Sequence, residues 1–271
     1  MSYTVIIQAR SGSTRLPGKI LKKVGNKTLL EYGVERIQKA QKIKEIIIAT
    51  TVNEKDDVIA QIAQANGIKY FRGSEADVLA RYYYAAKENS AETVIRITSD
   101  CPLIDPDIID LAIENYEKQS CDILTNVPMM DKINLPKRYG CRNFSFKWLE
   151  EAFYHAKETY EREHVTPYLY TNAQKVYYDR AEKDYSGYRL TLDTEEDLNV
   201  ITQIITALYN PDKVFHLEDI IQFLDANPAI WKINSNINKR KFKMIYFRAD
   251  ANGVIASGHI MRCITIALGN L

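Results

Sequence analysis

Residues 92–119 read ETVIRITSDCPLIDPDIIDLAIENYEKQ, and this stretch contains the pattern that decides the fold. Residues 93–98 are rich in β-branched side chains, as in a buried strand, and apolar residues recur at helical spacing after Pro106. Asp105 and Asp107 flank this proline, an order that favours an N-cap, a first helical position and an acidic first turn. We therefore predict a strand followed by a helix, and we interpret the D-x-D pattern as helix capping rather than as a metal motif.

The same alternation extends towards the N-terminus. Strand-like runs are followed by amphipathic stretches, which predicts an α/β fold whose mixed, mainly parallel sheet is covered by helices on both faces. Thr28 with Glu31 and Ser74 with Asp77 have the spacing of a capping box, and Gly67 stands where a helix ends in a left-handed residue. The expected strands are 3–8, 44–51, 69–73 and 121–126, and the expected helices are 28–40, 54–67 and 74–90.

The second half of the chain begins with a predicted long loop. It covers residues 127–139, which lose periodicity and contain two prolines. A helix from about residue 147 follows, then strand-like runs at 175–181 and 187–193 and helices at 195–209 and 217–227. We expect one domain over 1–230, a polar linker over 231–243, and, over 244–271, the first βα unit of a truncated second domain.

Composition excludes several function classes. The 271 residues are 46% hydrophobic, and 36 basic against 35 acidic residues leave a net charge of +1. Such a chain has no global field to hold nucleic acid or an anionic membrane. No leader or membrane-spanning pattern is present, so the expectation is a cytoplasmic protein. The four cysteines are far apart and form no CxxC, which disfavours zinc and disulfides.

Residues 8–19, QARSGSTRLPGK, form the strongest candidate for a binding loop. Five residues separate Gly12 from Gly18, and no hydroxyl residue follows Lys19, so this is not a Walker A motif. A loop of small residues after a strand still exposes backbone N–H groups to a phosphate. Hydroxyls from Ser11 and Ser13 add donors, and the cations of this segment would neutralise a triphosphate. The alternative interpretation is a solvated basic turn.

The segment IIQARSGSTRLPGK resembles the signature of the nucleotidyltransferases that activate sugars, especially the cytidylyltransferases for acidic sugars. Further segments, FRGSEADVLARYYYAA, VIRITSDCPLIDP, EREHVTPYLY and YRLTLDTEEDL, are most similar to the spore-coat polysaccharide biosynthesis protein F group. The resemblance covers about residues 1–230. It implies a three-layer, Rossmann-like nucleotidyltransferase domain of the GT-A-like type that binds CTP and an acidic sugar. It assigns catalysis to Arg10 and Lys19, and nucleotide binding to Ala9, Arg10, Ser11, Gly12, Ser13, Arg15, Lys19 and Arg72.

Two carboxylates are candidate metal ligands. Asp100 follows a predicted strand, where open α/β sheets bind ligands, and Asp193 ends the alternating run YRLTLD. Each also has a structural interpretation: Asp100 as a turn-capping residue, and Asp193 or Thr194 as the start of a helix with Asp197 at capping-box spacing. The family resemblance implies that Asp100 and Asp193 bind Mg²⁺, which prefers oxygen ligands.

Other charged residues are candidates for substrate contacts. Arg96 is charged within an apolar strand, so it is expected to have an anionic partner. His164, in EREHVTP, resembles a family element beside the sugar site, although an isolated histidine there is equally compatible with a structural role. The segment FRGSEADVLARY matches the family pattern, and its structural alternative is an exposed i, i+4 ion pair between Asp77 and Arg81. Arg142 and Asn143 stand where the family often has an acidic residue.

Residues 246–263, YFRADANGVIASGHIMRC, resemble the opening of the nucleotide-sugar hydrolases of pseudaminic-acid synthesis, with His259 matching the expected base. With only one βα unit present, we expect no hydrolase activity. The combined hypothesis is a Mg²⁺-dependent cytidylyltransferase that activates a nonulosonic acid for surface polysaccharide and releases pyrophosphate. The alternatives are a glycosyltransferase and a non-catalytic nucleotide-binding module. Apolar helix faces after Asp193 are compatible with a homodimer.

Overall fold

The computed structural model describes residues 2–127, 134–136 and 139–237. Within these ranges no helix has both the length and the apolar character needed to cross a membrane. The elements are β1 (Tyr3–Gln8), η1 (Lys19–Leu21), β2 (Lys23–Val24), β3 (Lys27–Thr28), α1 (Leu29–Ile37), β4 (Glu45–Thr51), η2 (Glu54–Asp56), α2 (Asp57–Ala65), β5 (Lys69–Gly73), α3 (Val78–Glu88), β6 (Thr93–Thr98), α4 (Pro106–Gln119), β7 (Ile123–Thr125), β8 (Arg142–Ser145), α5 (Phe146–His155), α6 (Thr159–His164), α7 (Pro167–Asn172), β9 (Val176–Tyr178), α8 (Glu195–Leu208), α9 (Leu217–Ala226) and α10 (Pro228–Ser235).

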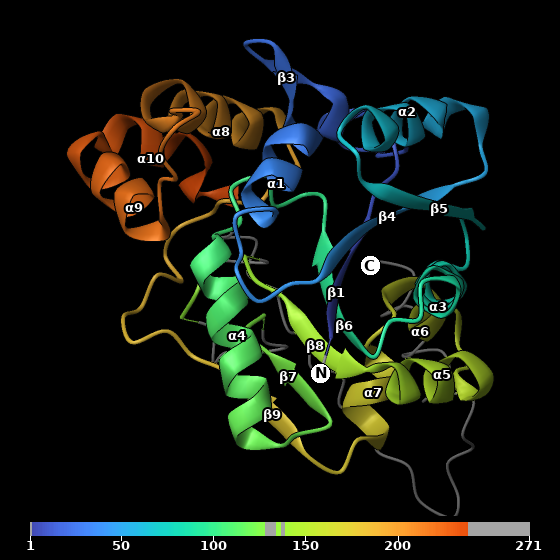
Figure 1. The fold of residues 1–271 in the computed structure, drawn as a ribbon. Helices are drawn as coiled ribbons and strands as arrows, with labels where there is room; N and C mark the ends of the chain where they lie inside the picture. The colour runs from blue at the N-terminus through green and yellow to red at the C-terminus, as the bar shows by residue number, and fades with distance from the viewer. Residues whose placement is uncertain (1, 128–133, 137–138, 238–271) are drawn as a thin grey trace, which may run out of the picture. The chain divides into compact units, whose positions relative to one another are not determined.

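The main sheet has the strand order β5-β4-β1-β6-β8-β7-β9 in the described part of the chain. Strands β5, β4, β1 and β6 are parallel, and β8 is antiparallel to both of its neighbours. The sheet is therefore mixed and mainly parallel, as predicted. Strands β1 and β6 lie side by side at its centre (Figure 1), so the loops after them leave the same edge of the sheet.

Alternate residues of the strands build two cores. Val5, Ile95 and their neighbours pack with α1, α2 and α4 on one face. Ile6 and Val94 pack with α3, α5 and α7 on the other face. Because successive strand residues point to opposite faces, one set of apolar runs supplies both layers of helix packing. The three-layer α/β architecture is confirmed.

A third apolar cluster lies beyond the sheet, where α8, α9 and α10 gather at one end of the fold (orange to red in Figure 1). Helix α10 includes residues 231–235, which were predicted to begin a linker. Its Asn234 is 1% exposed, so this stretch packs against the rest of the described fold. The rest of the expected linker and the expected βα unit over 244–271 fall outside the described residues.

Some of the predicted helix ends and strands are present in the structure, and others are not. The capping box of Thr28 and Glu31 is present, and Gly67 has a φ of +66°. Helix α3, however, starts at Val78 with Asp77 as its N-cap, so the Ser74–Asp77 box is wrong; the Ser74 hydroxyl only accepts from the Asp77 N–H. Residues 187–193 form no strand, because they run into a helical layer instead of pairing with the sheet.

Candidate active site

The loop after β1 folds back on itself and presents Lys19. The Gly18 N–H donates to the Ser11 carbonyl at 3.0 Å, and Gly18 has a φ of +63°, which favours glycine. Lys19 then begins η1, with its side chain only partly exposed. The loop is thereby closed at its base, and the lysine is directed into the fold.

Asp56 anchors the first half of this loop. Its Oδ1 accepts from both the N–H (2.7 Å) and the hydroxyl (2.6 Å) of Ser11, and its Oδ2 accepts from the Thr51 hydroxyl. Burial raises the pKa of Asp56, but the hydrogen bonds from Ser11 and Thr51 outweigh this effect and lower it below its ordinary value. Ser11 thus has both donors on Asp56, a partner that sequence analysis missed because 45 residues separate the two.

Lys19 lies between the two predicted metal-binding carboxylates. Its Nζ is 2.9 Å from Asp193 Oδ1 and 3.9 Å from Asp100 Oδ2, and it donates to the Leu192 carbonyl at 2.7 Å. Arg15 Nη2 is 3.1 Å from Asp193 Oδ2. The structure therefore brings together four of the predicted residues at the carboxyl edge of the sheet, with two negative and two positive charges.

Backbone bonds fix the two carboxylate-bearing segments to each other. The Leu192 N–H donates to the Asp100 carbonyl at 2.8 Å, and the Thr191 hydroxyl is 3.4 Å from the same oxygen. Leu190 and Leu192 are buried among the residues of the third cluster. Although residues 187–193 are not a strand, their extended backbone still carries Asp193 to the end of β6.

Asp197 holds the backbone of the segment that carries Asp193. Its carboxylate is 0% exposed, forms an ion pair with Arg189 at 2.7 Å, and accepts from the N–H groups of Asp193 and Thr194. The amide of Asn234, from α10, donates to it as well, at 2.9 Å. The capping box with Thr194 is confirmed, but sequence analysis saw only the cap and missed the ion pair.

Arg10 lies on the other side of the loop. Its Nη1 is 3.2 Å from Glu75 Oε1, and Lys55 is 3.3 Å from the same oxygen. A Cβ added at Gly12 would stand 3.2 Å from Glu75 Oε1 and 3.3 Å from Lys55 Nζ, so a larger residue there would require these two flexible side chains to shift. Ala9 is buried, and Ser13 accepts from the Leu16 N–H at 3.4 Å.

The remaining predicted residues lie in other surroundings. Arg72 donates to the Thr51 and Asn53 carbonyls and pairs with Asp57 at 2.6 Å, so it holds the β4–η2 connection. His164 is exposed at the end of α6, with its ring against Tyr160. Roles in nucleotide or sugar binding stay predictions for both.

Two arginines differ from expectation. Asp77 pairs with Arg162, while Arg81 is 2% exposed, so the exposed Asp77–Arg81 pair is wrong. Among the described residues Arg96 has no carboxylate partner; its Nη2 donates to Gln8 Oε1 at 2.8 Å. Within the described residues the contact partner of Arg96 is therefore a neutral amide, and the Asp100 carboxylate acts on it only from beyond contact distance.

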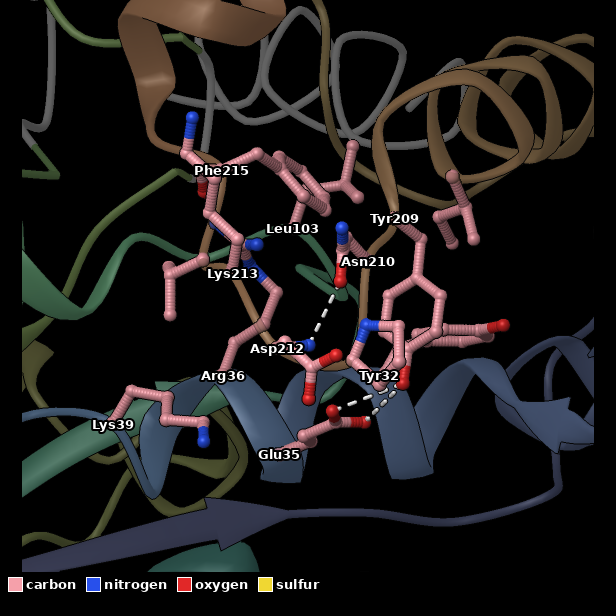
Figure 2. A pocket seen from close by; sticks show the side chains of 13 residues that line it. Tyr32, Glu35, Arg36, Lys39, Leu103, Tyr209, Asn210, Asp212, Lys213 and Phe215 are labelled. Atoms are coloured by element: carbon pink, nitrogen blue, oxygen red, sulfur yellow. Dashed lines mark hydrogen bonds between the residues drawn. The ribbon is translucent and has the colours of Figure 1, made fainter.

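Two cavities lie away from this centre. A pocket between α1 and residues 209–215 is lined by polar side chains that have partners within the protein: Tyr209 donates to Glu35 (Figure 2), and Arg36 donates to two backbone carbonyls. A larger cavity of about 410 Å³ borders Asp105 and His216. Asp105 accepts from the N–H groups of Asp107 and Leu217, which supports helix capping as the reason for the D-x-D pattern.

Comparison with known proteins gives consistent matches. The family described as cytidylyltransferase matches residues 4–235. An uncharacterized protein of Methanocaldococcus jannaschii is 39% identical over 251 residues, which cover 90% of this chain and 99% of that protein. The spore coat polysaccharide biosynthesis protein SpsF of Bacillus subtilis is 32% identical over 243 residues, covering 82% and 94%.

Solved structures agree. A cytidylyltransferase from Leptospira borgpetersenii superposes with a TM-score of 0.79 at 35% identity, over 85% of this chain and 97% of that chain. A CMP:2-keto-3-deoxy-manno-octonic acid synthetase complexed with CTP has a TM-score of 0.59 at 17% identity, over 77% of this chain and all of that one. This second likeness concerns the fold.

Proposed function

The chain belongs to the cytidylyltransferase family, and we propose that it transfers CMP from CTP to an acidic sugar, of the nonulosonic kind, for the synthesis of a surface glycan. As a nucleotidyltransferase of the CMP-sugar synthetase-like type, it has the fold and the family that the sequence resemblance implied. The observation that carries the proposal is the convergence of Lys19, Asp100 and Asp193 beside the β1 loop.

The reaction needs charge placement more than covalent work by the protein. The anomeric hydroxyl oxygen of the sugar forms a bond to the α-phosphorus of CTP, and the bond from that phosphorus to the β-bridging oxygen breaks. Pyrophosphate leaves and the hydroxyl proton passes to solvent. Arg10, Arg15 and Lys19 supply positive charge to the phosphates, and the closed loop keeps these groups oriented before substrate arrives.

Magnesium fits the donor set at this centre. Asp100 and Asp193 offer hard carboxylate oxygens that already share one cation, the Lys19 ammonium, at 3.9 and 2.9 Å. In our proposal these two residues hold the Mg²⁺, with phosphate oxygens and waters completing its ligands. Bound there, the ion would neutralise phosphate charge in the transition state. Lys19 would then turn towards the phosphates, because Mg²⁺ and the Lys19 ammonium would compete for the same two carboxylates.

Pyrophosphate release is the direct test. The protein is incubated with CTP, UTP, ATP or GTP and a panel of acidic and neutral sugars, with and without Mg²⁺. We expect release with CTP and an acidic sugar only. Transfer of sugar from a nucleotide sugar, with release of nucleoside diphosphate, would instead identify a glycosyltransferase. Affinity for CTP without release over the whole panel would contradict the proposed activity.

A further inference from the structure

Two arginines lie side by side on neighbouring strands of the sheet, next to the candidate active site. In the antiparallel ladder of β6 and β8, Arg96 is the direct partner of Arg142. Side chains of directly paired residues lie on the same face with Cβ atoms about 4.5–5.5 Å apart, and like charges there are destabilising. The pairing therefore needs a compensating negative charge.

Among the described residues the Asp100 carboxylate acts on Arg96 electrostatically, but no carboxylate is in contact with either arginine. Arg96 is 5% exposed, its Nε has no hydrogen-bond partner, and its guanidinium lies 5.7 Å from the Tyr82 ring centroid. Arg142 Nε donates to the Tyr170 hydroxyl at 3.1 Å. Within the described part of the chain, no carboxylate forms an ion pair with either guanidinium.

Burial makes this pairing of two positive charges costly. Desolvation lowers the pKa of Arg96 to about 10, and the positive charge of Arg142 adds to this shift. Tyr82, Tyr170 and the Asp100 carboxylate oppose it without cancelling it. The guanidinium still carries its charge at neutral pH, because that value lies well above 7. A buried charge of this kind is retained at a loss of stability unless an anion pairs with it.

The position of the pair connects it with the reacting groups. Gln8, which accepts from Arg96, is the last residue of β1 and directly precedes the loop that carries Arg10 and Lys19. Asp100 follows Arg96 by four residues, so their Cα atoms are at most roughly 13 Å apart at 3.3 Å per residue. Two side chains with a small ligand between them can span this distance.

We propose that Arg96 and Arg142 form the subsite for the carboxylate of the sugar acceptor, with Gln8 and Tyr170 orienting the two guanidinium groups. This inference rests on the proposed function and deepens it, because it assigns substrate class to two residues. Guanidinium groups bind carboxylates through paired, charge-assisted hydrogen bonds. In a sugar acid whose carboxylate is on the anomeric carbon, this contact would also place the attacking hydroxyl.

The test compares Arg96→Gln and Arg142→Gln with wild type and with Arg180→Gln, a control at an exposed arginine. Melting temperatures are measured with 3-deoxy-manno-octulosonate and N-acetylneuraminate, with the methyl ester of each, and with CTP. We expect at least one acid, but neither ester, to raise the melting temperature of wild type and the control. Both subsite variants should lose this shift and keep the shift caused by CTP, which also shows that they are folded.

Kinetics separate this inference from the proposed function. For a sugar acid that turns over, KM should rise about 10- to 100-fold in each subsite variant, as expected for losing a hydrogen bond to a charged group, while KM for CTP stays unchanged. Pyrophosphate release from a neutral sugar would overturn the carboxylate subsite and leave the cytidylyltransferase activity standing. A melting-temperature shift caused by the acid, without pyrophosphate release, would support the carboxylate subsite and contradict the cytidylyltransferase activity.

Four results would overturn the subsite. The acid-dependent shift could persist in both variants, or the esters could bind as well as the acids. Loss of the CTP shift in Arg142→Gln, whose side chain is only half-buried, would mean that the pair binds a nucleotide phosphate instead. A wild type that responds to neither acid would also count against the proposal.

Discussion

Lys19 Nζ and Asp193 Oδ1 lie 2.9 Å apart although 174 residues separate them in the chain. One residue ends the loop after β1 and the other precedes α8, so the ion pair closes the candidate active site across the fold. Both side chains are largely shielded from solvent, which makes this contact stronger than an exposed surface pair. The pair also links the loop that we propose to bind phosphate to the segment that carries a predicted metal ligand.

Replacing Lys19 by Ala should lower kcat for pyrophosphate release about 10²- to 10³-fold, as expected when one fixed charge that stabilises the transition state is removed. Lys23→Ala is the matched control, because Lys23 is exposed in the same segment. Circular dichroism and melting temperature report on folding. Wild-type turnover in Lys19→Ala would remove this residue from the mechanism.

Asp100→Asn and Asp193→Asn should raise the Mg²⁺ concentration needed for half-maximal activity, because each removes one anionic oxygen ligand. Asp107→Asn, an exposed change at the start of α4, should leave this dependence unchanged. The measurement is a Mg²⁺ titration of pyrophosphate release after treatment with EDTA. Identical titration curves for all three variants and wild type would place the metal elsewhere.

Asp197→Asn should destabilise the protein by about 3–5 kcal/mol, the usual cost of breaking a buried ion pair from one side. Asn234→Ala should cost about 1–3 kcal/mol, because it leaves buried polar groups without their amide donor. Urea unfolding gives both values. The prediction is that Asp197→Asn loses more free energy of unfolding than Asn234→Ala. A larger loss for Asn234→Ala would contradict the central role of the Asp197 carboxylate.

Asp56 should make stability depend on pH in the acid range. Hydrogen bonds lower the pKa of its carboxyl in the folded state below the ordinary value of 3.8, so its stabilisation is complete above that value and is lost as the pH falls through the folded-state pKa. Asp56→Asn should therefore be less stable than wild type at pH 7, and the difference should shrink below pH 3.8. Unfolding curves over this range test the sign. A difference that grows on acidification would be inconsistent with a lowered pKa.

Local sequence patterns predicted the elements that depend on near neighbours. The Thr28 box, the left-handed Gly67 and the alternation of strands and helices all follow from residues a few positions apart. The mainly parallel sheet followed because strands joined through helices pair in parallel. The run at 187–193 alternates like a strand, but its leucines pack on the α8–α10 layer, and tertiary context overrode the local pattern.

The candidate site was predicted only in part, for a related reason. The family signature pointed to Lys19, Asp100 and Asp193, and the structure places these three together. The contact of Asp56 with Ser11 was missed because 45 residues separate the two in the chain. Asp197 was recognised only as a capping residue, so its buried ion pair with Arg189 was missed. The Arg96–Arg142 pairing depends on strand register, which composition and spacing do not reveal.

The hydrogen bond between Asn234 and Asp197 sets a C-terminal limit for the part of the chain that contains the candidate active site. A polypeptide cut at residue 230 would keep every predicted catalytic group, yet it would lose most of α10 and the amide that holds the carboxylate beneath Asp193. The smallest autonomous enzyme should therefore extend through Ser235. Shorter polypeptides should lose turnover because Asp193 would no longer be held in position, even though every predicted catalytic residue would still be present.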